Sequence, residues 1–357
     1  MSRVAALLRT PWFWALVGIV VLLVINTIKD PGYLAIGVNP NTGMMTGNVL
    51  DILRVSAPII LISIGMTFVI ATEGIDLSVG SMMAVGGAAA MQTLSTLAEP
   101  NSVPAMLQAI GLAVLIAAVL GALNGILISV VGLQPFITTL VMMMAARGIA
   151  RVITGGQNTN ARNEPFRLLA NGQIFGIPTG FVIAVVIVAL VAVLMRRTAL
   201  GLMIEAIGIN PQASRLAGIR PRPILIAVYV LAAVLASLAG VLNVAEVMTV
   251  NPSSTGNLLE MDAILAVVIG GTSLAGGKFS IIGSTLGALL IATLNKTVVF
   301  LGVPSAATPA FKAVVIIALV LLQSERIRSL VLGRKKPQST APVAPAAATQ
   351  DSKEVVA

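Results

Sequence analysis

The stretch "LISIGMTFVIATEGIDLSVGSMMAVGGAAA" at residues 61–90 decides the fold class. It joins an apolar run to a Gly/Ala/Met-rich run through a short segment that holds two carboxylates, Glu73 and Asp76. Apolar runs of about 20 residues can cross a bilayer as helices, whereas the strands of a membrane barrel are short and alternate apolar with polar residues. The stretch therefore predicts two membrane-spanning helices separated by a polar break.

The composition of the whole chain agrees with a membrane protein. Of its 357 residues, 57% are hydrophobic and only 10% are charged, and the mean hydropathy is +1.01. A soluble domain usually carries about 25% charged residues, because a globule needs a polar surface. Cysteine and histidine are absent, which excludes disulfides, thiol chemistry and histidine-based metal sites or proton relays. We expect neither a metal nor a cofactor.

About ten apolar runs follow one another along the chain, so we expect an all-α polytopic membrane protein with broken or re-entrant segments. The run at 262–272 is short and is either a brief span or a re-entrant segment. Small residues four positions apart, such as Gly121 and Gly125 or Gly283 and Gly287, predict close helix packing in lipid. The expected spans cover residues 12–28, 50–72, 79–97, 105–131, 136–154, 179–195, 223–247, 262–272, 280–301 and 310–323.

Basic residues set the expected orientation. The 196–222 loop holds five arginines against one acid, Glu205, and a second basic cluster follows the last span. Cytoplasmic loops are enriched in Lys and Arg, so this loop and both termini are expected in the cytoplasm, which ten spans satisfy and nine do not. Residues 1–325 then form one transmembrane domain, and residues 326–357 form a basic and then disordered tail. The net charge of +9 is explained by these flanks, and no nucleic-acid-binding motif accompanies it.

The carboxylates of the break have more than one possible role. If the following helix begins near residues 77–81, Asp76 is its N-cap or a first-turn acid, and the alternative is direct contact with a transported solute. Glu73 lies either in water at the membrane surface or beside an arginine. The other acids, Glu246, Glu260 and Asp262, also lie near expected helix ends. No span has an acid at its centre, which disfavours a proton- or ion-driven carrier.

The energy source is a separate question. The segment "GTSLAGGKFS" at 271–280 fails as a phosphate-binding loop, because Thr272 replaces the first glycine and Phe279 follows Lys278 where Ser or Thr is needed. The chain therefore shows no ATPase of its own. The 196–222 loop holds a helix-compatible stretch at 211–217 that Gly218 ends. This loop either presses a short helix into a groove on a partner or is a solvated basic loop.

Four segments together resemble one family. They are "GIDLSVGS" at 74–81, "NGILISVVGLQPFITTLVMMMAARG" at 124–148, "GLMIEAIGINPQASRLAGI" at 201–219 and "MDAILAVVIGGTSLAGG" at 261–277. In this order they resemble permease subunits of bacterial ABC importers for simple sugars, the ribose/xylose/galactose group, and most of all the galactofuranose-type branch. The resemblance runs from about residue 50 to about residue 325.

The resemblance implies an inner-membrane permease that works with three partners. They are a cytoplasmic ABC ATPase, a periplasmic sugar-binding protein and a second permease subunit, identical or sister. It assigns the signature stretch and helix break to Gly74, Asp76, Leu77, Ser78 and Gly80, and coupling to the ATPase to Glu205, Ala206, Gly208, Asn210, Ala213 and Gly218. The family usually has glycine at the position of Glu73, so a role of Glu73 would be specific to this branch.

Polar residues on otherwise apolar segments are candidates for a translocation path: Asn124, Gln134, Thr138, Thr139, Asn243 and Asn295. They either line the route of a sugar or join helices. The expected function is the transport subunit of a monosaccharide importer, with ATP hydrolysis by another chain. The alternative is a secondary, ion-coupled carrier of a small polar solute. An intramembrane enzyme is a third hypothesis, but no His or Cys is available as its nucleophile or base.

Overall fold

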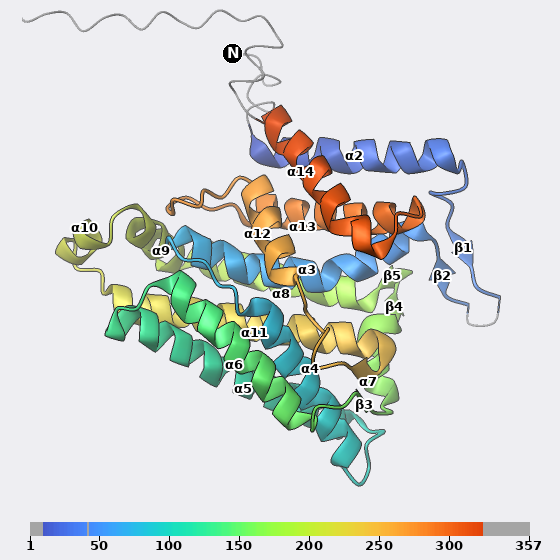
Figure 1. Ribbon diagram of the computed structural model, residues 1–357, viewed down its shortest axis with the longest axis horizontal. Coiled ribbons are helices and arrows are strands. Elements are labelled where there is room, and N and C mark those ends of the chain that lie inside the picture. Colours follow the sequence, from blue (N-terminus) through green and yellow to red (C-terminus); the bar gives the residue numbers. More distant parts are fainter. Residues whose placement is uncertain (1–9, 41–42, 324–357) are drawn as a thin grey trace, which may run out of the picture.

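A computed structural model describes residues 10–40 and 43–323, and the tail expected at 326–357 lies outside them (Figure 1). The described chain is mainly helical, which confirms the predicted fold class. Its strands form three short antiparallel pairs. β1 (Gly37–Val38) pairs with β2 (Met45–Thr46), β3 (Thr159–Asn160) with β6 (Thr249–Val250), and β4 (Gln173–Ile174) with β5 (Ile177–Pro178).

Every expected span coincides with a helix. In chain order these are α2 (Pro11–Lys29), α3 (Asn48–Ala71), α4 (Val79–Thr96), α5 (Val103–Ile126), α6 (Pro135–Ile153), α8 (Thr179–Arg197), α11 (Pro221–Val247), α12 (Leu259–Ile269), α13 (Ile281–Phe300) and α14 (Thr308–Gln323). A π-helical turn, η1 (Leu127–Val131), prolongs α5, and a 3-10 turn, η2 (Ser305–Ala307), precedes α14. Helices α7 (Glu164–Asn171), α9 (Leu200–Ile209) and α10 (Pro211–Leu216) lie in the connections.

Seven helices of the described chain are long and apolar enough to cross a membrane. They are α2, α3, α5 with η1, α6, α8, α11 and α13. The other three expected spans differ for physical reasons. α4 is rich in Gly and Ala, α12 has only 11 residues and α14 has 16. A helix of 11 residues is about 16 Å long and cannot cross about 30 Å of hydrocarbon alone.

The most buried spans are α3, α11 and α13, and α4 lies among them. In α3 and α13, 78% and 67% of the apolar window is buried, against 22% in α2, α5 and α8. Small residues let the backbones approach. A Cβ on Gly121 would lie 2.7 Å from the Cβ of Ala233, and one on Gly125 would lie 2.6 Å from the Cα of Ile226. The predicted packing role of this glycine pair on α5 is confirmed.

Polar contacts fasten α2 and α14 to this core. The buried side chain of Asn26 donates to the hydroxyl of Thr297 at 2.8 Å, which ties α2 to α13. The Lys312 ammonium on α14 lies 3.1 Å from a carboxylate oxygen of Asp262 on α12. Figure 1 shows α9 and α10 at one end of the bundle, and β4, β5 and α7 toward the other. The two ends therefore differ in the elements that they expose.

Candidate translocation and coupling site

The break between α3 and α4 is a compact, internally bonded turn. α3 ends at Ala71 and α4 begins at Val79. Asp76 is 1% exposed, and its Oδ1 accepts hydrogen bonds from the amide of Ser78 at 2.8 Å and from its hydroxyl at 2.5 Å. Ser78 is the N-cap, so the prediction that Asp76 is the N-cap or lies in the first turn is wrong. The carboxylate instead holds the N-cap residue in place.

Side chains from α5 and α6 fasten the break. The amide of Asn124 donates to the Ser78 hydroxyl at 3.2 Å. The Thr139 hydroxyl accepts from the amide of Leu77 at 3.2 Å and donates to the carbonyl of Ile75 at 3.0 Å. Buried polar groups that are satisfied in this way fix one geometry. Two of the residues proposed for a translocation path thus join helices.

The other path candidates lie apart from this cluster. Thr138 donates to the carbonyl of Gln134 on its own helix, and Gln134 itself is exposed at the start of α6. Asn295 on α13 donates to Asp262 at 3.3 Å. Asn243 is half-buried on α11. The structure therefore does not bring the six residues together in one site.

Helices α9 and α10 form an elbow at one end of the bundle, between α8 and α11 (Figure 1). Asn210 caps α10, since its Oδ1 accepts from the amides of Gln212 and Ala213 at 2.9 Å each. Gly218, with φ of +86°, follows the helix, as the sequence predicts. Glu205 and Ala206 are half-buried on α9. The sequence analysis did not predict α9 as a helix.

Two exposed apolar side chains of the elbow were missed by sequence reasoning. Ile209 is 71% exposed and Leu216 is 92% exposed, at the ends of α9 and α10. Large apolar side chains that project into solvent beside charges are typical of contact sites for a partner. The available signal was an apolar residue on each side of the Asn-Pro capping motif at 210–211.

The elbow touches two breaks of the membrane domain through backbone atoms, at a point that we call the glycine junction: Ala71, Glu73, Gly208, Gly276 and Gly277. The amide of Gly277, in the loop between α12 and α13, donates to the carbonyl of Ala71 at the end of α3 at 2.9 Å. A Cβ on Gly208 of α9 would overlap that same carbonyl oxygen. A Cβ on Gly276 would lie 2.7 Å from the carbonyl of Gly208 and 3.2 Å from the Cβ of Glu73. Three segments far apart in sequence therefore meet without intervening side chains.

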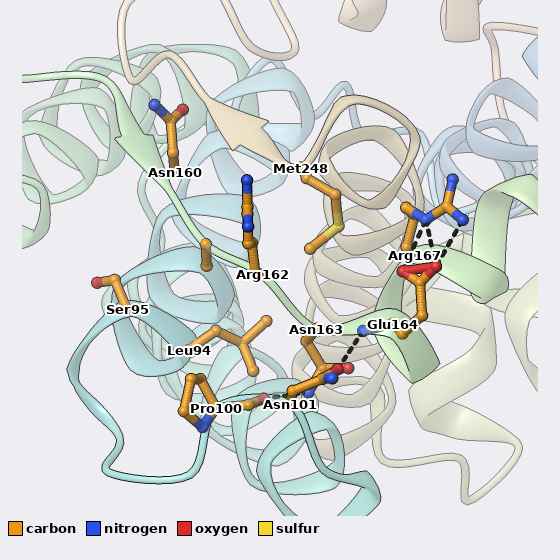
Figure 2. A pocket seen from close by; sticks show the side chains of 11 residues that line it. Leu94, Ser95, Pro100, Asn101, Asn160, Arg162, Asn163, Glu164, Arg167 and Met248 are labelled. Atoms are coloured by element: carbon orange, nitrogen blue, oxygen red, sulfur yellow. Dashed lines mark hydrogen bonds and ion pairs between the residues drawn. The ribbon is translucent and has the colours of Figure 1, made fainter.

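Hollows lie at both ends of the bundle. A hollow of about 290 Å³ at the elbow is lined by Glu205 and Arg196 together with residues 279–282. A larger hollow of about 930 Å³ lies between the end of α4 and the start of α7 (Figure 2). Its polar lining residues include Asn160, Arg162 and Asn163. The larger one has room for a small polar solute.

The helix α7 beside the larger hollow is held by a dense set of bonds. Asn163 caps it, accepting from the amide of Phe166 at 2.6 Å and donating to the carbonyl of Ser102 at 2.9 Å. Arg167 donates to both carboxylate oxygens of Glu164, as Figure 2 shows, and this hydrogen bonding lowers the pKa of Glu164 below its ordinary value of 4.5. The motif Asn-Glu-Pro at 163–165 is typical of a helix start and could have predicted α7.

The described residues offer no cluster of three or more acidic side chains that could hold a metal ion. Residues 48–323 match the protein family described as "Branched-chain amino acid transport system / permease component". The chain belongs to this permease family. The predicted resemblance to permeases is therefore confirmed, and the chain is a multi-pass membrane permease.

Several relatives align with this permease over nearly their whole length. The fructose import permease protein of Bifidobacterium longum is 51% identical over 340 residues, which cover 94% of this chain and 94% of that protein. The galactofuranose transporter permease protein of Escherichia coli is 38% identical over 91% of this chain and 93% of its own length. The ribose import permease protein of Escherichia coli is 37% identical over 87% and 93%. No solved structure matches the chain.

Proposed function

We propose that this permease is the membrane-spanning subunit of an ATP-driven importer that carries a monosaccharide into the cell. The names of the relatives support the substrate class, because fructose, galactofuranose and ribose are all simple sugars. The observation that carries the proposal is the glycine junction, where the exposed elbow contacts two breaks of the membrane domain.

The glycine junction suits the transfer of motion. Backbone atoms of α9 rest directly on the end of α3 and on the loop before α13, so no flexible side chain absorbs a small displacement. Packed interiors have low compressibility and pass strain to their neighbours. A partner that tilts α9 would therefore move both breaks together.

The outer face of the elbow suits an ATPase. Ile209 and Leu216 supply exposed apolar anchors, and Arg215 and Arg220 stand beside them. Buried anchors supply most of the affinity of an interface, and charges at its rim guide association. Asn210 and Gly218 fix both ends of α10, which carries Arg215 and Leu216, while Ile209 ends α9 and Arg220 precedes α11. We assign the coupling role to this elbow.

The remaining parts of the proposal follow from this assignment. The elbow and both termini face the cytoplasm, and the larger hollow beside α7 faces the periplasm, where a sugar-binding protein delivers its cargo. The weakly buried faces of α2, α5, α6 and α8 contact lipid or a second permease subunit. The segment at 271–280 supports an ATPase in a separate chain, because the amide of Gly277 is engaged by Ala71 instead of being free for phosphate.

Reconstitution in lipid vesicles tests the proposal. The permease is combined with an ABC ATPase and a sugar-binding protein from the same genome, and uptake of D-fructose, D-ribose and D-galactose is measured. We expect uptake only when all components and ATP are present. Uptake by the permease alone, driven by an imposed ion gradient, would instead establish the secondary carrier.

A further inference from the structure

Charged and polar groups of α6, of the segment 251–258 and of the start of α12 form a strip. We define this strip by Arg147, Asn257 and Glu260. Arg147 lies on α6, which is long and apolar enough to span a membrane. Its Nη1 donates to the carbonyls of Thr255 at 2.5 Å and Pro252 at 3.3 Å, and its charge interacts with that of Glu260. Charged groups at membrane depth are costly and are kept mainly for function.

The segment 251–258 is non-helical, although it lies against the core helices. The Cα of Gly256 approaches the carbonyl of Gly80 on α4, and the neighbouring Met83 packs on Gly240 of α11. Irregular backbone at membrane depth is tolerated only where protein buries it or where it lines a water-filled cavity. Asn257 is exposed here, so protein does not cover the whole segment. The exposed part is therefore expected to face water.

The groups of this strip have hydrogen-bonding capacity to spare. In the described structure, the side chain of Asn257 makes no hydrogen bond and Arg147 uses only Nη1, while the largely buried carboxylate of Glu260 accepts only from its own backbone amide. The side chains of Asn124 and Thr139, in contrast, already donate hydrogen bonds to the break between α3 and α4. Gly148, one position after Arg147, faces open space, since a Cβ there would meet nothing within 4 Å. The surface of α6 next to Arg147 is therefore not packed against another part of the described chain.

We infer that the imported sugar passes along this strip, with Asn257 and Glu260 as contact residues and Arg147 as the residue that positions the 251–258 segment. The inference rests on the proposed function and names the part of the molecule that carries it out. A carboxylate accepts and an amide both donates and accepts, which suits the neighbouring hydroxyls of a neutral sugar.

Cysteine labelling tests the route directly, because the chain contains no cysteine of its own. The Asn257→Cys and Leu115→Cys variants are reconstituted and treated with a charged, membrane-impermeant thiol reagent. Leu115 is the matched control, since it is 60% exposed on α5 and should face lipid. We expect the reagent to modify Asn257→Cys at least about tenfold faster, because a charged reagent requires water at the thiol. The sugar that wild-type protein accumulates should slow this labelling.

Two results would overturn the inference. One is an Asn257→Cys thiol that reacts no faster than Leu115→Cys, which would place the strip against lipid or a second subunit. The other is fast labelling that the transported sugar does not change. Wild-type uptake in the same vesicles is measured separately, so failure of the proposed function is seen as the loss of uptake itself.

A second variant removes the charge of the acceptor without shortening the side chain. Glu260→Gln should raise the KM for sugar uptake by about tenfold, because a hydrogen bond to a charged acceptor is stronger than one to a neutral amide. ATP hydrolysis should stay coupled. Arg151→Gln is the control, because Arg151 is an exposed charge on α6, one turn beyond Arg147, and replacing it by Gln also removes one charge. Equal KM values in Glu260→Gln and Arg151→Gln would count against Glu260 as a contact residue.

Discussion

Replacing Gly208 by alanine is the sharpest test of how motion passes from the elbow into the membrane domain. The added Cβ would overlap the carbonyl oxygen of Ala71 and would lie 2.6 Å from the amide nitrogen of Gly277. Since Cβ contacts below 3.0 Å essentially do not occur, α9 must move away from both atoms. Neither obstacle can swing aside, because both are backbone atoms.

The expected cost of Gly208→Ala has two parts. Overpacking costs about 1–3 kcal/mol, and loss of the hydrogen bond from Gly277 to Ala71 costs about 1 kcal/mol. A total of about 2–4 kcal/mol corresponds to a shift on the order of a hundredfold in the equilibrium between the native junction and a displaced one. A bulkier change such as Gly208→Trp should displace the elbow further.

The assay compares sugar uptake with ATP hydrolysis in vesicles that contain the ATPase and the binding protein. We expect Gly208→Ala to lose at least about tenfold in uptake per ATP hydrolysed, and to melt at a lower temperature than wild type. Gly111→Ala is the matched control, because a Cβ on Gly111 of α5 meets nothing within 4 Å. Wild-type uptake and melting in Gly208→Ala would refute the view that this backbone contact transmits force.

Three further substitutions test single interactions in the described structure. Lys312→Leu leaves the nearly buried carboxylate of Asp262 with a hydrogen bond from Asn295 but without its cation, so we expect the free energy of unfolding of the detergent-solubilised protein to fall by about 3 kcal/mol. Replacing both members of that pair by leucine should recover most of the loss. Asn163→Ala removes the cap of α7. Amide hydrogen exchange in that helix should speed up by a factor that corresponds to a loss of about 1–2 kcal/mol in helix stability. Unchanged exchange would show that the cap is dispensable. Because the pKa of Glu164 is lowered by Arg167, its contribution is present above pH 4.5 and is lost as the pH falls through the lowered pKa. The protection of the α7 amides, measured relative to their intrinsic exchange rate at each pH, should therefore fall in acid in wild type but not in Glu164→Gln.

The helices were predictable because the signal for each was local. A run of apolar residues predicts a span wherever it occurs, and all ten expected runs are helical. The shortness of the 262–272 run was also visible, and the structure shows there a helix of 11 residues. The elbow was predicted in part. Pro211 and Gly218 mark α10, whereas the apolar sequence of α9 carries no amphipathic pattern that separates it from the preceding span.

The partners of the polar side chains were not predictable. Asn124 and Thr139 looked like path residues because they are polar in apolar surroundings. Their hydrogen-bond partners lie in the break, 46 and 64 residues away in sequence, and only the folded chain shows that those bonds are made. Asn257 drew no attention because it lies in a Ser/Thr/Gly-rich stretch that is typical of a surface loop. Polarity identifies a group that needs a partner, but packing decides which groups remain without one.

The two glycine-rich breaks contact each other and the elbow. The signature break joins α3 to α4, and the loop at 270–280 joins α12 to α13. The amide of Gly277 binds Ala71, so the breaks are in direct contact, and Gly208 of the elbow rests on both. α4 also packs on Gly256, at the start of the strip that we assign to the sugar. A displacement of α9 would therefore reach the strip through a single helix, α4, and an importer built in this way needs no charged relay between its ATPase and its cargo.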